Sequence, residues 1–238
     1  MKTWGIIGLG WLGLELKNRL EADGDEVWGT HSQEFNFQSD PFPQKEADLL
    51  FLNTPPIVSM SPTDYVRKIS SKAKKIILIS STSVYGRNSG KIDETTFPLP
   101  ITNSAKWLVE VENRLRSQFG VRLTVIRPGG LIGGDRHPIK SLSGRTDVAD
   151  GNHPINLIHR DDLIGITILA ASISGLSILN AVAPFHPAKR DYYADCAEKL
   201  CLPMATFNDT DSEGREIASL FVPQFYKDWK FPKLDGFK

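Results

Sequence analysis

A glycine-spaced turn at the start of the chain constrains its fold most. The apolar run Thr3–Ile7 leads into Gly8, Gly10 and Gly13, and a helix-period segment follows. In that context Gly8 permits a tight turn, Gly10 lets backbone N–H groups approach a pyrophosphate, and Gly13 lets a helix pack closely on a strand. The pattern favours dinucleotide binding over a merely tight turn. The cofactor-binding residues predicted here are Gly8, Gly10, Trp11, Leu12 and Gly13, with Trp11 as a lid or packing residue.

The rest of the first half alternates apolar runs with segments of helical period, which is typical of a parallel sheet with crossover helices. The predicted strands are Thr3–Ile7, Glu26–Gly29, Leu49–Leu52, Ile76–Ile79 and Leu123–Ile126. The predicted helices are Trp11–Leu20, Thr63–Lys72 and Asn103–Phe119. We therefore expect an α/β fold with a Rossmann-like doubly wound parallel sheet.

The second half is less regular. Loop residues dominate from 128 to 154, and the tail from 209 to 238 has no clear period. Further predicted elements are a helix over 161–171, a strand over 178–182 and a helix over 188–200. We expect a single domain over residues 1–238, with a small C-terminal substrate lobe formed mainly by residues 133–160 and 184–238.

Composition limits the partners. The 238 residues carry 28 Lys and Arg against 28 Asp and Glu, without a polybasic block. This balance argues against nucleic acid and against an anionic membrane surface, so a small-molecule substrate is the expected partner. Met1–Gly8 runs into a strand without a signal peptide, and no segment is apolar enough to span a bilayer, so we expect a cytoplasmic monomer or homodimer. Cys196 and Cys201 are expected to be buried thiols, with no metal site.

The end of the second predicted strand bears on cofactor choice. An NAD-selective site usually has Asp or Glu here to bind the ribose hydroxyls. Thr30, His31 and Ser32 occupy this position instead. A carboxylate would repel a 2′-phosphate, whereas these side chains can donate hydrogen bonds to it. The sequence therefore favours NADP over NAD, although His31 can also be read as a solvated loop residue.

Several later motifs follow one another in a recognisable order. The run Ile-Ser-Ser-Thr-Ser-Val-Tyr-Gly spans residues 79–86, and Lys106 follows on a predicted helix. Further on come Arg-Pro-Gly-Gly-Leu-Ile-Gly-Gly-Asp-Arg (127–136) and Asn-Leu-Ile-His-Arg-Asp-Asp-Leu (156–163). Together these segments resemble the extended short-chain dehydrogenase/reductase superfamily, in its NAD-dependent epimerase/dehydratase branch. The resemblance runs from Gly5 to about residue 182, roughly three quarters of the chain.

The resemblance implies a catalytic group that is incomplete here. Ser81 matches the family's catalytic serine or threonine, and Lys106 matches the lysine that holds the nicotinamide ribose. Thr102 occupies the position of the catalytic tyrosine, and a threonine hydroxyl titrates far above the phenol that would exchange a proton with substrate. The sequence thus resembles atypical members of the superfamily. Tyr85 is a weaker substitute, because its family equivalent is structural.

Other residues gain roles from the same resemblance. Asn53 and Thr54 lie where the family's chain passes the adenosine-ribose and pyrophosphate side of the cofactor. Thr82 and Ser83 follow the serine, and Arg136 lies in the loop that covers the substrate, so all three are candidate substrate residues. His159 is expected to be structural, bonding backbone carbonyls beside Asp161 as a helix N-cap.

These observations leave more than one function open. The leading hypothesis is an NAD(P)-binding oxidoreductase or epimerase acting on a small polar carbonyl compound or a nucleotide-sugar-like substrate. The missing tyrosine favours an alternative, a non-catalytic NAD(P) sensor that regulates a partner. A hydroxyacid dehydrogenase fits the Gly-Leu-Gly-x-x-Gly turn, but not the serine-rich strand end or the chain length.

Overall fold

The computed structural model describes residues 1–209 and 212–235, and within them the chain forms two compact units. The first unit comprises residues 1–86, 98–127 and 164–179. The second comprises residues 87–97, 128–163 and 180–238, apart from the undescribed positions 210–211 and 236–238.

The central sheet confirms the predicted α/β class and its Rossmann-like order. Its six strands lie in the order β2-β1-β3-β4-β6-β9, and the registers from β2 through β6 are all parallel. The strands are β1 (Thr3–Ile7), β2 (Glu26–Thr30), β3 (Leu49–Leu52), β4 (Lys75–Ile79), β6 (Leu123–Pro128) and β9 (Ile178–Ala181). The chain leaves β1 for β2 on one side and then returns to β3 on the other, so the topology switches beside β1.

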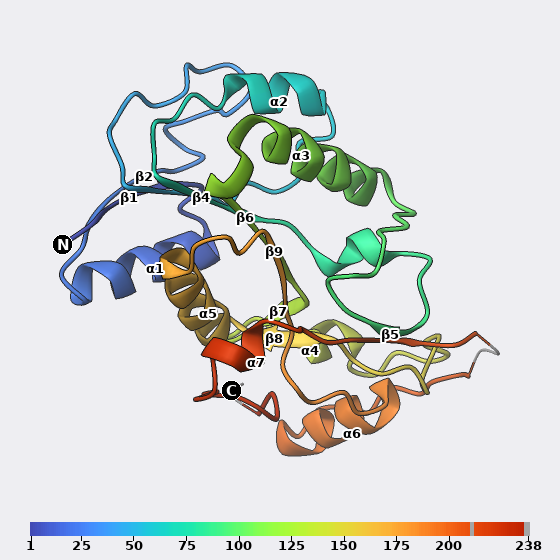
Figure 1. Ribbon diagram of the computed structural model, residues 1–238. Helices are drawn as coiled ribbons and strands as arrows, with labels where there is room; N and C mark the ends of the chain where they lie inside the picture. The colour runs from blue at the N-terminus through green and yellow to red at the C-terminus, as the bar shows by residue number, and fades with distance from the viewer. Residues whose placement is uncertain (210–211, 236–238) are drawn as a thin grey trace. The chain divides into compact units, whose positions relative to one another are not determined.

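Helices cover both faces of this sheet in the first unit (Figure 1). Figure 1 shows α2 (Pro62–Lys68) and α3 (Asn103–Phe119) on one face and α1 (Trp11–Ala22) on the other. Every residue of β3 and β4 is buried, as expected for central parallel strands covered on both sides. The continuous apolar runs of the sequence are explained by this double burial.

The helix predicted over Thr63–Lys72 ends earlier than expected. Its last helical residue is Lys68, because the backbone of Ile69 is extended (φ −76°, ψ 98°) and its side chain is buried. The connection from β2 to β3, residues 31–48, contains no helix or strand. It is anchored by Phe37, whose ring stacks on Tyr65 with centroids 4.5 Å apart. Tyr65 in turn contacts Trp107 of α3 edge to face, so aromatic packing holds this connection in place of a crossover helix.

The described residues of the second unit form two small parallel sheets and several short helices. β7 (Gly130–Ile132) pairs with β8 (Leu157–His159), and β5 (Gly90–Ile92) pairs with β10 (Arg215–Ile217). Its helices are α4 (Ile139–Leu142), α6 (Lys189–Lys199) and α7 (Val222–Phe225), and α5 (Arg160–Ser172) begins here and continues in the first unit. The loop-rich region from 128 to 154 and the tail from 209 therefore hold short elements whose periods are too brief to detect in sequence.

Three local expectations in the second unit are corrected. Asp161 is not an N-cap, because α5 already begins at Arg160. The Nδ1 atom of His159 accepts a hydrogen bond from the Asp161 N–H at 3.1 Å, so this histidine bonds a backbone donor rather than a carbonyl. Cys196 is buried, but Cys201 is exposed, since it follows the end of α6 with φ of 52°.

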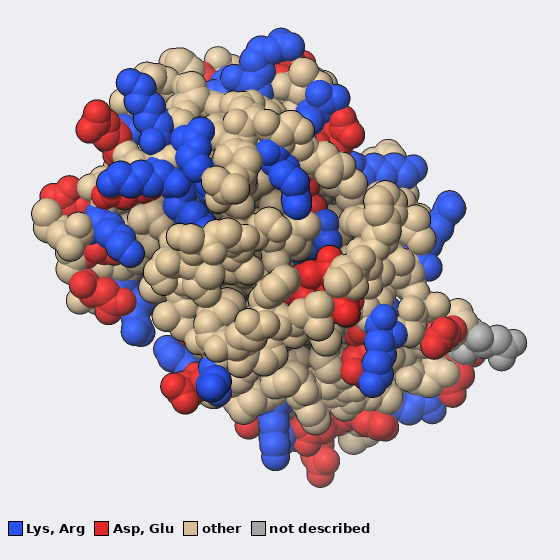
Figure 2. Space-filling view, in the orientation of Figure 1, with Lys and Arg blue, Asp and Glu red and all other residues tan. Residues whose placement is uncertain are grey.

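The surface carries charges of both signs, as expected from the equal numbers of acidic and basic residues in the sequence. On the face shown in Figure 2, basic and acidic side chains are interspersed among uncharged ones. None of the helices in the described ranges is long and apolar enough to cross a membrane. Likewise, residues 1–209 and 212–235 hold no cluster of three His, Cys, Asp or Glu side chains suited to a metal ion.

Candidate functional site

The candidate site lies in the first unit, at the carboxyl ends of β1, β3 and β4. Parallel strands place their carboxyl ends at one edge, and ligands of open α/β sheets bind there at the switch point. Three predicted segments follow these strand ends: the glycine turn after Ile7, Asn53 and Thr54 after Leu52, and the serine run after Ile79. The topology therefore brings together segments that are far apart in sequence.

The glycine turn has the geometry that its spacing predicts. Gly8 adopts φ of +106°, and a Cβ there would lie 2.7 Å from the Asn53 carbonyl oxygen. A Cβ on Gly13 would collide with the carbonyl oxygen of Gly8. Two of the three glycines are thus required by the close approach of backbone to backbone.

Gly10 differs from the other two glycines, because a Cβ built there meets nothing within 4 Å. It caps the twelve-residue helix α1 without a side-chain hydrogen bond, and the first turn of that helix holds no acidic residue. A helix N-terminus with open space and no local carboxylate suits an anion such as a pyrophosphate. Trp11 is half-buried and Leu12 is buried beside it, which agrees with packing roles.

Two polar side chains brace the glycine turn from neighbouring strands. The Oγ1 atom of Thr30 accepts a hydrogen bond from the Gly8 N–H at 3.2 Å, and the Asn53 Nδ2 donates to the Gly8 carbonyl at 3.0 Å. The backbone N–H of Leu9 also donates to the Thr30 carbonyl at 2.8 Å. Thr30 and Asn53 therefore shape the turn itself, a role that sequence reasoning did not assign to them.

The remaining residues after β2 and β3 differ in exposure. His31 and Ser32 are exposed, and the His31 Nδ1 accepts a hydrogen bond from the Gln33 N–H. Thr54 is half-buried, and its Oγ1 lies 2.9 Å from the Tyr65 hydroxyl. Burial raises the pKa of Tyr65 to about 12, so this phenol stays protonated at neutral pH.

The serine run turns into a short 3-10 helix, η1 (Thr82–Tyr85). Ser81 is its N-cap, and the Ser81 Oγ accepts a hydrogen bond from the Ser83 N–H at 3.0 Å. Ser81 is half-buried, Thr82 is buried and Ser83 is exposed. The cap fixes the Ser81 side chain while its hydroxyl hydrogen is left for another acceptor.

Tyr85 is not available as a substitute for the missing tyrosine. Its side chain is fully buried, and its hydroxyl accepts a hydrogen bond from Arg127 Nη1 at 2.8 Å. The Arg127 guanidinium also lies over the Tyr85 ring, 5.1 Å from its centroid. A phenol enclosed in this way serves packing and hydrogen bonding.

Thr102 and Lys106 lie at the start of α3, where the Lys106 N–H donates a hydrogen bond to the Thr102 carbonyl at 3.0 Å. Thr102 is the N-cap, with extended backbone (φ −78°, ψ 155°), and its Oγ1 accepts a hydrogen bond from the Ala105 N–H at 3.1 Å. Lys106 is in the first turn and is exposed.

A buried ion pair next to these residues was missed in the sequence. Glu112 of α3 and Arg127 of β6 are 2% and 3% exposed, and they pair through both carboxylate oxygens. Burial alone would lower the pKa of Arg127, but the Glu112 carboxylate and Tyr85 raise it above its ordinary value. The available signal was a glutamate on the apolar face of a helix and an arginine at the end of an apolar strand.

In the second unit, the neighbouring loop residues Arg136 and His137 differ in exposure. Arg136 is exposed and its backbone closes a tight turn with Gly133. His137 is buried, with Nε2 2.9 Å from the Tyr192 hydroxyl and Nδ1 accepting from the Ile139 N–H. Burial, with a smaller contribution from Lys140, lowers the pKa of His137 to about 4, so it is neutral at physiological pH.

Comparison with known proteins places this geometry in a family. No protein-family model matches the chain. A UDP-glucuronic acid 4-epimerase from Bacillus cereus, solved with NAD, has a TM-score of 0.77 at 17% identity, covering 98% of this chain and 94% of that one. A putative NAD-dependent epimerase/dehydratase from Methylobacillus flagellatus has a TM-score of 0.75 at 20% identity, covering 99% and 96%. The chain therefore shares the fold of these epimerase and epimerase/dehydratase structures, as expected from the sequence motifs.

A nearer relative was found by sequence. Protein YeeZ of Escherichia coli K12 is 33% identical over a 248-residue alignment that covers 90% of this chain and 90% of YeeZ. The chain belongs to the same family as YeeZ.

Proposed function

We propose that the chain binds NAD(P) at the glycine turn and acts as an oxidoreductase or epimerase on a small polar carbonyl compound, such as a nucleotide-sugar. The observation that carries this proposal is the contrast among the three glycines. Gly8 and Gly13 are crowded by backbone, whereas a Cβ on Gly10 would meet no atom within 4 Å, and the first turn of α1 holds no acidic residue. The NAD found in the Bacillus cereus epimerase supports the choice of a nicotinamide dinucleotide.

For the finer choice of cofactor, we propose NADP over NAD. The last residue of β2, Thr30, and the next two, His31 and Ser32, include no carboxylate. His31 and Ser32 are exposed and can contact a 2′-phosphate, and the Thr30 hydroxyl keeps its hydrogen for donation. Asn53 and Thr54 complete the adenosine-ribose side of the proposed site.

The proposed chemistry assigns two side chains of the first unit, Ser81 and Lys106, to the reacting end. A bound nicotinamide supplies hydride transfer. Ser81 donates a hydrogen bond to the substrate carbonyl, and Lys106 binds the nicotinamide ribose. Thr82, Ser83 and Arg136 are proposed substrate residues. Because Thr102 cannot act as the acid, the proton comes from Ser81 with water or from the substrate itself.

A non-catalytic NAD(P) sensor is the second candidate. The observation that favours it is the capping bond of Thr102, because the hydroxyl at the tyrosine position serves the helix instead of a substrate. A crystal structure with NADP separates the two functions. A nicotinamide ordered beside Ser81 and Lys106 supports the enzyme, and a disordered ring supports the sensor.

Gly10→Asp tests dinucleotide binding itself. Aspartate caps helices better than glycine, and the site has room for it, so α1 should remain folded. Its carboxylate would repel a pyrophosphate at the helix N-terminus, and we expect affinity for NADP and NAD to fall at least about tenfold by calorimetry. Gly10→Ser is the matched control, since serine caps equally well without charge. Equal affinity in the two variants would show that the turn has only a structural role.

A further inference from the structure

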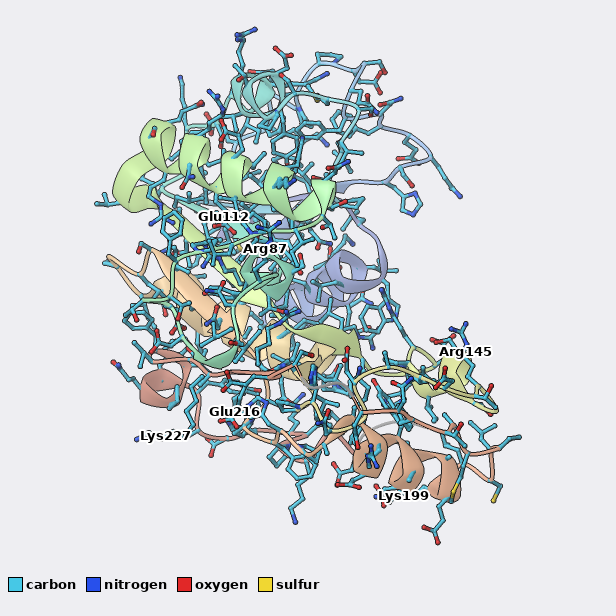
Figure 3. The ribbon with its side chains drawn as sticks, turned by 90° about the vertical axis from the view of Figure 1, so that its right-hand side faces the viewer. Arg87, Glu112, Arg145, Lys199, Glu216 and Lys227 are labelled. Carbon is cyan, nitrogen blue, oxygen red and sulfur yellow. The ribbon has the colours of Figure 1, made fainter. Side chains whose placement is uncertain are left out.

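The buried ion pair belongs to a larger cluster that joins four segments of the first unit. The Ser80 Oγ donates to Glu112 Oε1 at 2.5 Å, and the same oxygen accepts from Arg127 Nε at 3.2 Å. Arg127 Nη2 donates to Glu112 Oε2 at 2.5 Å, and its Nη1 donates to the Tyr85 hydroxyl. All four side chains are less than 9% exposed. Figure 3 shows Glu112 on the side of α3 that faces the sheet.

Burying the charges of Glu112 and Arg127 is unfavourable in free energy. Removing two charges from water costs several kcal/mol for each ion, and apolar residues of similar volume often give equal or greater stability. Stability alone therefore does not explain an ion pair at this place. What the pair does supply is fixed geometry, because Arg127 uses three nitrogens in fixed directions.

The position of the cluster indicates what it fixes. Ser80 immediately precedes Ser81, and Tyr85 ends the 3-10 helix that Ser81 caps, so the bonds hold both ends of the hydroxyl-bearing segment. Glu112 lies on α3, the helix whose first turn holds Lys106. One rigid cluster thus connects the segment that bears Ser81 to the helix that bears Lys106.

We propose that Glu112 and Arg127 are positioning residues that hold Ser81 and Lys106 in register for the nicotinamide half of the bound dinucleotide. The proposal rests on the proposed function, because it requires a dinucleotide at the glycine turn. In this proposal the cluster positions the residues that contact the nicotinamide half. The residues expected to contact the pyrophosphate, Gly8 and Gly10, do not depend on it.

The test removes hydrogen bonds between the ion pair and the segment that bears Ser81, while the ion pair itself stays intact. Ser80→Ala and Tyr85→Phe remove the side-chain hydrogen bonds to Glu112 and from Arg127, respectively, and leave Glu112 paired with Arg127, so neither buried charge loses its counter-charge. Thr124→Val is the matched control. Thr124 is a buried hydroxyl in β6 that donates to the Leu176 carbonyl at 2.5 Å, outside the cluster.

Affinities for NADP and for adenosine 2′-phosphate 5′-diphosphate are measured for each variant, with NAD and ADP as the second pair. The truncated ligands keep the pyrophosphate and lack both nicotinamide and the ribose that carries it. In Ser80→Ala and Tyr85→Phe we expect affinity for the complete dinucleotide to fall about two- to tenfold relative to the truncated ligand. In Thr124→Val we expect that ratio to equal the wild-type ratio.

Hydrogen exchange provides a readout without ligand. The Ser83 N–H, bonded to the Ser81 Oγ, should exchange faster in Ser80→Ala and Tyr85→Phe than in Thr124→Val. An unchanged affinity ratio together with unchanged Ser83 exchange, in variants that are merely less stable, would overturn the positioning role. Failure of the wild-type chain to bind any of the four ligands would instead overturn the proposed function, and with it the role toward nicotinamide.

Discussion

At the scale of single residues, the Thr102 hydroxyl has a structural role that replacement by a side chain unable to cap the helix removes. It caps α3 through the Ala105 N–H, so replacing it changes helix stability as well as any chemistry. The exposed position leaves room for a larger side chain. Stability and activity at this residue must therefore be measured against a control that loses the cap alone.

Thr102→Tyr and Thr102→Phe form such a pair. Both lose the cap, and we expect both to be less stable by about 1 kcal/mol in denaturant unfolding. Only tyrosine adds a phenol near Lys106 that can exchange a proton with substrate. We expect slow NADP-dependent turnover of a polar carbonyl compound by the tyrosine variant above that of the phenylalanine variant. Equal rates in the two would favour the sensor.

Cofactor choice is also a residue-scale property. Thr30→Asp supplies an acceptor for ribose hydroxyls and repels a 2′-phosphate, so the ratio of NAD to NADP affinity should rise at least about tenfold. Asparagine at the same position is the neutral control of matched shape. A wild-type chain that already prefers NAD strongly would contradict the proposed cofactor preference.

At the scale of elements, α1 and β1 meet at the backbone of the glycine turn. Gly13 is buried, and any Cβ there meets the carbonyl oxygen of Gly8, which cannot move without breaking its bond to Asn53. Gly10 begins the same helix with open space around it. The two glycines thus differ in packing although both belong to one motif.

Gly13→Ala should therefore lower the free energy of unfolding by about 1–3 kcal/mol, despite the higher helix propensity of alanine. Gly10→Ala should be within about 1 kcal/mol of wild type, because it meets no atom. Urea unfolding of the two variants measures the difference. Similar stabilities would mean that the helix shifts away from the strand at little cost.

At the scale of the whole molecule, buried His137 couples folding to pH. Its pKa is about 4 in the folded chain and about 6.5 when solvated, so between these values the unfolded chain binds a proton that the folded chain does not. Stability from this group is complete above pH 6.5 and is lost as pH falls toward 4, by about 3 kcal/mol in total.

Denaturant unfolding from pH 7 to pH 4 measures this loss. His137→Gln should be less stable at pH 7 but should lose less stability across the same interval. His31→Gln, a change at an exposed histidine, is the control for solvent-facing imidazole. An equal pH slope in wild type and His137→Gln would show that another group causes the loss.

Much of the fold was determined by local sequence pattern. Apolar runs and helical periods located all six strands of the central sheet and α3, and the glycine spacing located the turn that opens α1. These features depend on interactions among residues a few positions apart, so they can be recognised before the chain folds. The assignments of Ser81, Lys106 and the other proposed cofactor and substrate residues remain predictions, because they depend on a ligand.

Only the tertiary structure decided which polar groups serve packing. Glu112 and Arg127 meet because α3 and β6 pack together, and Thr30 and Asn53 reach Gly8 because β2 and β3 flank β1. Thr102 caps a helix and Tyr85 is a buried hydrogen-bond partner of Arg127. Sequence spacing alone allowed either side chain to be a proton donor. A hydrogen bond or ion pair between distant residues has no periodic signature, and its partner is chosen only when burial removes water as the alternative.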